Sequence, residues 1–475
     1  MRNARGLLPL AVLLAGCGVL EPKVPDAESG IPAEWPLPPT TPATASIEDA
    51  EAAPERPGET VVAEIGWREF FTDPELERLI ERALENNRDL RVAVLNVDRA
   101  RALYRIQRAD RVPSLDANAT MTRTGGENVF VRNQAYSVGL GVPAYELDLF
   151  GRVRNLSEAQ FRAYLAQEEA ARSTQLSLIA EVANSWLALQ ADRELKRIAE
   201  AALANREQEL ALTERRFELG AASRLEVNQA KIELETARAD LWQFAGQVAQ
   251  DINALTLLSG APVDPQLLSG PVDLQASGLD ALPPGTPSEV LLRRPDVMQA
   301  EYTLHSTNAN VGAARAAFFP SITLTGSVGT ASDELSNLFE GGTDFWSFIP
   351  QVNLPIFQGG RLRGNLDASK AERDIALAEY ERSIQAAFRE VADALALTRT
   401  LAEQRASREA LLAAAENADD LSKRRYEAGA DSYLVLLDAQ RTLYAAQQAL
   451  VTTLLAQQVN RVTLYKALGG GWHES

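Results

Sequence analysis

The sequence predicts a mainly α-helical protein with a membrane β-barrel, in which long helical hairpins form a tunnel and four strands per chain contribute to the barrel. Three observations favour this fold class. A short Arg-Arg-aromatic-Glu motif occurs twice, two very long stretches contain neither Pro nor Gly, and two pairs of segments alternate apolar with small polar side chains. Uninterrupted stretches are typical of long helices, and alternation with a period of two is typical of strands.

The repeated motif marks the tips of two helical hairpins. The first copy begins Arg215-Arg216-Phe217 and the second begins Arg424-Arg425-Tyr426, at an offset of 209 residues. Each copy separates a long helical pattern from a shorter one. Gly220 and Gly429 stand where a left-handed helix C-cap belongs, and the serine three residues after each glycine can cap the next helix. The motif therefore predicts two helical hairpins.

Much of the remaining chain repeats as well. Residues 84–89 match residues 291–296 at an offset of 207. A shared period of this size predicts two structural repeats and not a solenoid of short ones. We place the first repeat at 67–286 and the second at 287–475. Each is expected to hold a β-hairpin, at about 114–149 and about 321–357, and a long helical hairpin, at about 155–258 and about 365–468.

The long stretches are residues 155–219 and 365–428, and each predicts one helix of roughly 95 Å at 1.5 Å per residue. Return helices are predicted at 223–258 and 432–468. In the second long helix, apolar or small residues recur alternately three and four positions apart, which indicates a coiled-coil seam. The seam residues are Leu377, Tyr380, Ile384, Ala387, Val391, Ala394, Thr398 and Leu401. An exposed coiled-coil spacer is the alternative interpretation of these helices.

Two shorter helices precede the first strand pair. Asp73-Pro74 predicts the start of one, because Asp caps helices and Pro favours the first turn. A second helix is expected at 89–110. The apolar face of the first consists of Leu76, Leu79, Ile80, Ala83 and Leu84.

The strand signal follows Pro113 and, in the second repeat, Pro320. We expect the last strand at 351–357, after a loop that carries the aromatic residues Phe339, Phe345, Trp346 and Phe348. Strands of about ten residues with flanking aromatics fit a membrane barrel, although an ordinary sandwich hairpin gives the same alternation. Four strands cannot close a barrel alone, because membrane barrels need about eight or more, so the chain must associate.

Composition excludes several classes of function. The formal net charge is -18, so the chain lacks the basic surface that binding of nucleic acid requires. One Cys and two His leave no cluster of metal ligands, and neither a nucleophile elbow nor a phosphate-binding loop is present. We therefore expect no enzyme activity, no catalytic residue, no metal site and no cofactor other than a covalent lipid.

The amino terminus predicts a lipoprotein. Arg2 and Arg5 precede an apolar run that ends in Leu14-Ala15-Gly16-Cys17, and the run is too short to cross a bilayer. Residues 1–16 resemble a bacterial lipoprotein signal peptide that leaves Cys17 lipidated. An ordinary signal peptide with a chance Cys is the alternative. The Pro-rich, acidic segment 17–66 is expected to be an extended tether, and the folded body to begin near Trp67.

Taken together, these motifs resemble the TolC family of outer-membrane efflux proteins, in its lipidated, OprM-like subfamily. The resemblance rests on the motifs Leu14–Cys17, Tyr145–Arg152, Leu291–Asp296, Phe318–Ile322 and the two hairpin tips. The resemblance implies a homotrimer with twelve strands in one outer-membrane barrel and twelve helices around a periplasmic tunnel. It implies a passive exit duct for drugs or other small molecules, served by a periplasmic adaptor and an inner-membrane resistance-nodulation-division transporter. A conduit for type I protein secretion and a coiled-coil scaffold are the alternatives.

The resemblance also assigns residues at the tips. Tyr426 and Glu226 resemble a pair that holds the periplasmic gate shut, and Asp438 resembles an acid of an inward-facing ring. Asp431 stands where the family places a basic gate residue, and Val435 where it places another acid. Packing and solvation are the plain alternatives for these side chains. The tip residues expected to contact the adaptor are Arg215, Arg216, Gly220, Ser223, Arg424, Arg425, Gly429 and Ser432.

Overall fold

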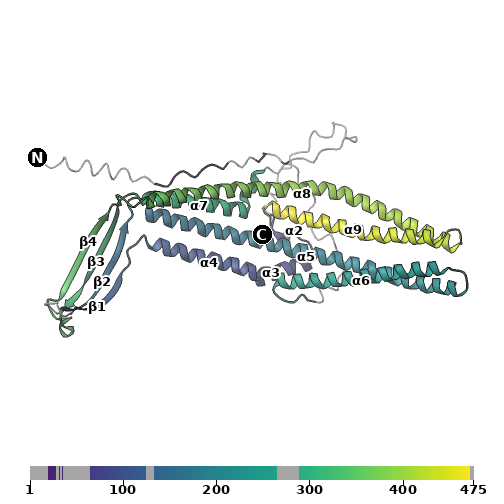
Figure 1. Cartoon of the computed structure of the whole chain (residues 1–475), viewed down its shortest axis with the longest axis horizontal. Coiled ribbons are helices and arrows are strands. Elements are labelled where there is room, and N and C mark those ends of the chain that lie inside the picture. The colour runs from purple at the N-terminus through teal and green to yellow at the C-terminus, as the bar shows by residue number, and fades with distance from the viewer. Residues whose placement is uncertain are drawn as a thin grey trace. The chain divides into compact units, whose positions relative to one another are not determined.

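The computed structural model describes residues 20–27, 31–32, 35, 65–124, 133–264 and 288–470 (Figure 1). Contacts group the chain into two compact units, and each unit draws on both predicted repeats. One unit holds residues 1–29, 94–170 and 296–383, and the other holds residues 30–93, 171–295 and 384–475. The elements in chain order are α2 (Trp67–Phe70), α3 (Pro74–Asn86), α4 (Arg88–Ala109), β1 (Asp116–Thr124), β2 (Asn133–Leu147), α5 (Arg152–Glu218), α6 (Arg224–Ser259), the 3-10 helix η4 (Ser288–Arg293), α7 (Pro295–Ala316), β3 (Ser321–Ser332), the 3-10 helix η5 (Leu335–Asn337), β4 (Asp344–Asn353), α8 (Arg361–Glu427) and α9 (Tyr433–Ala467).

The four strands form one antiparallel sheet in the order β1-β2-β3-β4. The central pair joins strands from the two predicted repeats, with Gly139 opposite Gly329. These glycines permit close approach, because a Cβ atom on Gly139 would lie 2.6 Å from the carbonyl oxygen of Val328. β1 and β4 are the edges of the sheet within one chain.

The fourth strand differs from the prediction. β4 covers Asp344–Asn353 instead of 351–357, and Phe345, Trp346 and Phe348 belong to the strand instead of the loop. The register explains the difference, because Thr330 near the end of β3 pairs with Asp344. Pro350 is compatible with this assignment, since an edge strand tolerates a residue without an N–H group. The adjacent aromatic residues Phe345 and Trp346 interrupt the alternation of apolar and polar side chains by which a strand is predicted.

The two long helices are each 67 residues, and each begins a few residues before its predicted start. At the start of α5, the Asp148 carboxylate accepts hydrogen bonds from the backbone N–H groups of Val153 (3.2 Å) and Arg154 (2.7 Å). This side chain satisfies donors that have no partner inside the helix. At the start of α8, Gly364 lies within the helix and does not end it.

The predicted seam on α8 is confirmed. Within it Ile384, Ala387, Val391 and Ala394 are at most 2% exposed. The other four seam residues are buried or half-buried. On α9, Asn460 donates hydrogen bonds to the carbonyl oxygen of Ala394 at 3.0 Å and to Thr398 at 3.0 Å. Small side chains let the helices approach closely, and the buried amide fixes one register between them.

The residues around Trp67 pack against the C-terminal helix α9. Trp67 is buried, and the Phe70 ring stacks on Tyr465 of α9 at a centroid distance of 3.9 Å. Asp73 caps α3 by accepting from the N–H of Glu75 at 2.8 Å, and it also accepts from the indole of Trp186 at 2.8 Å. Among the described residues, no helix is both long and apolar enough to cross a membrane.

Gly260, the C-cap of α6, provides a test of the packing between the ends of α6 and α3. Gly260 has φ 68°, and a Cβ atom there would lie 2.6 Å from the carbonyl oxygen of Asn86. Gly220 has φ 72° but would meet no atom within 4 Å. An L-residue in this conformation costs about 1–2 kcal/mol at either position. We expect Gly260→Ala to lower the melting temperature more than Gly220→Ala, measured by circular dichroism; equal shifts would contradict the packing.

Candidate gate at the helical hairpin tips

Both tips have the same backbone geometry. Gly220 and Gly429 each have φ 72°, as the sequence predicts. Ala221 donates its N–H to the carbonyl oxygen of Arg216 (2.7 Å), and Ala430 donates to that of Arg425 (2.9 Å). These bonds, with those from the glycine N–H groups, form the Schellman motif that satisfies free carbonyl groups at a helix end. The two tips are thus turns of the same type.

The serines that follow differ from each other. Ser223 accepts a hydrogen bond at its hydroxyl from the N–H of Glu226 at 3.2 Å and so caps α6 as predicted. Ser432 occupies the N-cap of α9 but makes no side-chain cap bond, which corrects that prediction. Its carbonyl oxygen accepts the N–H of Val435 instead, at 3.1 Å.

Tyr426 links the two hairpins at their tips. Its hydroxyl accepts a hydrogen bond from Arg216 of α5, whose guanidinium lies 5.0 Å from the Tyr426 ring centroid. Burial raises the pKa of Tyr426, and the nearby Glu226 carboxylate adds to this increase. Within one chain Tyr426 therefore bonds to Arg216, with Glu226 close by; the proposed Tyr426–Glu226 pair stays a prediction. Arg215 and Arg424 are exposed and pair with acids on their own helices.

The acids on the second hairpin have different environments. Asp431 accepts two hydrogen bonds from Arg425, at 2.6 and 3.0 Å, and these bonds lower the pKa of its carboxyl group. Val435 is 46% exposed. Asp438 is exposed, and its carboxylate makes no hydrogen bond or salt bridge to any described residue. The charge of Asp431 is therefore balanced by Arg425, whereas Asp438 is exposed and interacts with Arg441 only through its charge.

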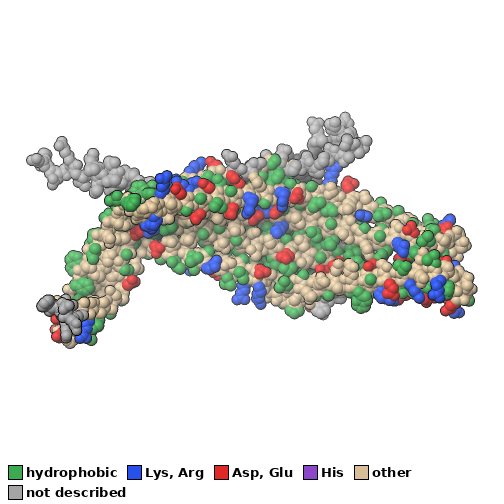
Figure 2. Space-filling model, viewed as in Figure 1, with side chains coloured by type: hydrophobic (Ala, Val, Ile, Leu, Met, Phe, Trp, Pro, Cys, Tyr) green, Lys and Arg blue, Asp and Glu red, His purple; other side chains and the backbone are tan. Residues whose placement is uncertain are grey.

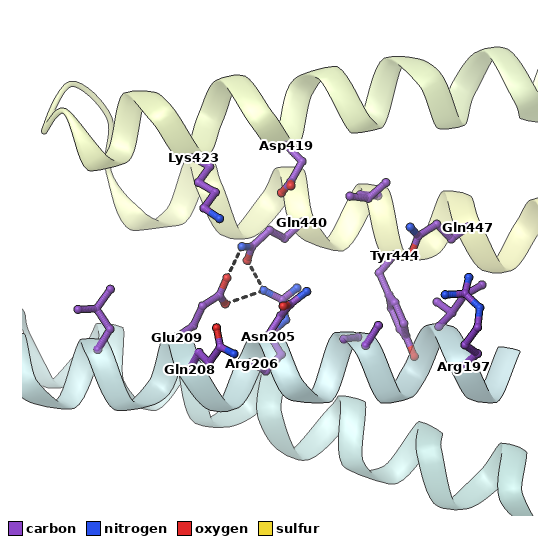
Figure 3. Close-up of a pocket in the computed structure, with 15 residues that line it drawn as sticks. Arg197, Asn205, Arg206, Gln208, Glu209, Asp419, Lys423, Gln440, Tyr444 and Gln447 are labelled. Atoms are coloured by element: carbon purple, nitrogen blue, oxygen red, sulfur yellow. Dashed lines mark hydrogen bonds and ion pairs between the residues drawn. The ribbon is translucent and has the colours of Figure 1, made fainter. Parts of the chain in front are cut away.

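A polar network that the sequence did not reveal joins the hairpins further along α5 (Figure 3). Arg206 is only 8% exposed and donates to Glu209 at 2.9 Å. It also donates to the side-chain oxygen of Gln440 on α9, while the Gln440 amide donates back to Glu209. The three groups satisfy one another, which a buried cation requires.

Two further links connect α9 to α6. Arg441 donates to Glu233 at 2.8 Å, and the hydroxyl of Tyr444 donates to Asp240 at 3.0 Å. Neighbouring residues of α9 thus contact both helices of the first hairpin. Their partners lie more than 200 positions away in the sequence, so no local pattern could have identified them.

A cavity of about 380 Å³ lies beside this network between α5, α8 and α9. Figure 3 shows Lys423 and Asp419 of α8 on one side, and Asn205 and Gln208 of α5 on the other. One carboxylate oxygen of Asp419 is buried and has no hydrogen-bond partner in the described part of the chain, and burial raises the pKa of this group. Among the described residues, no group of three His, Cys, Asp or Glu could hold a metal ion.

A carboxyl pair lies elsewhere on the first hairpin. Burial, followed by the charge of Asp192 on α5, raises the pKa of Asp251 on α6 to about 7. A second cavity of about 640 Å³ is lined by Asp251 together with Glu181, Glu390 and Lys466. At pH values between 3.8 and about 7, the folded chain therefore holds a proton on this pair that the unfolded chain would release.

This pair predicts a pH-dependent loss of stability. Because the folded-state pKa of Asp251 is raised from 3.8 to about 7, ionisation of the folded chain costs stability as the pH rises through this range. In thermal unfolding, Asp251→Asn should therefore have a higher melting temperature than the wild type at pH 8 and nearly the same melting temperature at pH 4. The exposed Asp393→Asn is the control. An Asp251→Asn difference that does not vary with pH would refute the assignment.

Comparison with known proteins identifies the family. A family model described as outer membrane efflux protein matches residues 79–261 and again residues 286–470. The probable efflux pump outer membrane protein TtgC of Pseudomonas putida is 46% identical and covers 99% of this chain and 96% of its own length. Outer membrane protein OprJ of Pseudomonas aeruginosa is 45% identical, over 89% of each. The open state of the MtrE outer membrane channel of Neisseria gonorrhoeae superposes with a TM-score of 0.86 at 36% identity, over 96% of this chain and 99% of that one. The chain therefore belongs to the outer membrane efflux protein family.

Proposed function

We propose that this protein is the outer-membrane channel of a tripartite efflux system, a passive exit duct for drugs or other small molecules. The observation that carries the proposal is the double match to the efflux family, each match covering a strand pair and a 67-residue helix with its return helix. The same double match supports two duplicated repeats, 67–286 and 287–475. Efflux is favoured over protein secretion because relatives such as TtgC are named as outer membrane proteins of efflux pumps.

The active form that we propose is a trimer. Four strands leave both β1 and β4 with unpaired edges, which lipid does not tolerate. Three chains supply twelve strands and close the barrel. Large apolar side chains on the sheet support contact with lipid, since Trp346 is 79% exposed and Phe348 is 60% exposed. Figure 2 shows hydrophobic side chains along the visible face of these strands.

The proposed anchor is a covalent lipid on Cys17, which lies outside the described residues. Its support comes from the sequence, because the sole Cys of the chain falls at the end of an apolar run. The proposed partners are a periplasmic adaptor at the hairpin tips and an inner-membrane resistance-nodulation-division transporter. The exposed arginines Arg215, Arg424 and Arg425 give the adaptor polar groups to bind.

The gate that we propose is formed where the hairpin tips meet around the threefold axis. The Tyr426–Arg216 bond, with Glu226 beside it, ties the second hairpin to the first. In a trimer the exposed Asp438 becomes three carboxylates around one axis. Such a ring concentrates negative potential, which attracts cations and binds multivalent ones.

Native mass spectrometry of the purified protein tests the trimer and the anchor together. We expect an assembly of three chains, each beginning at Cys17 and each heavier than the polypeptide by its acyl groups. Cys17→Ala should lose the acyl mass but still form trimers, because strand pairing and not the lipid requires association. A folded monomer would refute the barrel, and a mature chain without added mass would refute the anchor.

Single-channel recording in planar bilayers tests the duct and its gate. Tyr426→Phe combined with Glu226→Ala should raise the conductance, because it removes the bond to Arg216 and the neighbouring carboxylate. Asp438→Ala should weaken the block by a trivalent cation added from the periplasmic side. Tyr302→Phe and Asp98→Ala, on helices outside the tips, are the matched controls.

The outcomes of this recording separate two failures. Absence of any conductance from the wild type would contradict the proposed channel function itself. A conducting wild type whose conductance and cation block are both unchanged by the tip variants would place the gate in other residues and leave the channel function intact.

A further inference from the structure

Helix α7 carries a row of residues that contacts the start of the tether. Asn308, Gly312 and Arg315 are spaced by four and three positions, so they share one face of the helix. Residues 20–22 of the tether lie against this face and are half-buried, whereas the next residue, Lys23, is exposed. All of these residues belong to the same compact unit.

Asn308 supplies the strongest evidence that this face is built for the tether. The residue is 0% exposed, and its side-chain amide donates to the carbonyl oxygen of Pro22 at 2.7 Å and, more weakly, to the Glu21 carboxylate at 3.4 Å. Among the described residues, both partners of this amide belong to the tether. A buried amide without a hydrogen bond is costly, so Asn308 depends on the tether being in place.

Gly312 makes room for the same segment. A Cβ atom at this position would lie 2.9 Å from the Cα atom of Glu21 and 2.6 Å from the side-chain nitrogen of Asn155 on α5. The first of these contacts is to backbone, which cannot rotate away. Only glycine at this position therefore lets the tether lie directly on the helix.

Arg315 completes the row one turn further along. Its guanidinium donates to the carbonyl oxygen of Leu20 at 3.4 Å. Arg315 lies near the C-terminal end of α7, and β3 begins six positions later at Ser321. Leu20 follows Cys17 by only three positions. Even a fully extended chain spans about 10–11 Å over three residues, so Cys17 must lie within this distance of Leu20.

We propose that Asn308, Gly312 and Arg315 form a docking site for the extended backbone of residues 20–22, which holds the N-terminal anchor beside the strand-proximal end of α7. Two of the contacts are to main-chain carbonyl groups, so the site recognises an extended chain more than particular side chains. The docking itself is independent of the proposed function. Its role in positioning a membrane anchor rests on the proposed lipidation of Cys17.

Limited trypsin digestion tests the docking, because Lys23 offers an exposed cleavage site next to the seated residues. When the tether leaves its site and returns faster than trypsin cuts, the rate of cleavage follows the population of the undocked tether. Loss of one hydrogen bond should raise that population about fivefold. We expect Asn308→Ala and Arg315→Met to accelerate the appearance of a chain beginning at Val24 by about this factor, and Gly312→Ala by at least as much.

The controls separate docking from general loosening. Ser306→Ala removes a hydrogen bond of 2.8 Å from α7 to Ala159 of α5 without touching the tether. Gly364→Ala adds a Cβ atom to a helical glycine with no atom within 4 Å. Both should cleave at the wild-type rate, and Lys23→Gln should abolish the product. Equal rates for all variants, or acceleration by Ser306→Ala equal to that by Asn308→Ala, would overturn the proposal. Repeating the digestion on Cys17→Ala separates docking from lipidation, since slow cleavage there would show docking without the lipid.

Discussion

Lengthwise packing of the long helices is the constraint on which the rest of the structure depends. A helix of 67 residues cannot bury its apolar stripe in a compact core, so it must bury it against another helix along its length. The α8 seam does this with small and branched side chains, of which Val391 is 0% exposed. The long helix and the helix packed along it must therefore be kept in one register.

Turn geometry and buried polar groups keep that register. The left-handed Gly220 and Gly429 reverse the chain within a few residues, so each return helix must lie against the helix that precedes it. Asn460 then allows one sliding position, because any shift would leave its buried amide without the Ala394 carbonyl. A strictly apolar seam of alanines would permit several positions at nearly equal free energy.

The sequence was sufficient for features determined by local pattern and insufficient for those determined by distant partners. The hairpin tips and the α8 seam follow from glycine position and from spacing, and both are found where predicted. The bounds of β4 were wrong because consecutive aromatic residues conceal a strand whose limits are set by pairing with β3. The Arg206–Gln440 contact joins residues 234 positions apart, and nothing local to either residue indicates the other.

The contacts between the two hairpins combine apolar and polar terms with different physical roles. Towards the tip, Ala230 of α6 packs with Tyr433, Leu436 and Leu437 of α9; on the other side of the polar network, Ala191 and Ile198 of α5 pack with Val451. Burial of these groups gives a non-directional attraction of about 25 cal/mol per Å². The Arg206–Glu209–Gln440 network between them adds little net free energy, because desolvation offsets its bonds. Its geometry is nevertheless demanding, since a shift of one turn would remove the bond between the Arg206 guanidinium and Gln440 and leave only the bond to Glu209 on the same helix. The apolar clusters therefore hold the hairpins together, and the polar network determines where along their length they meet.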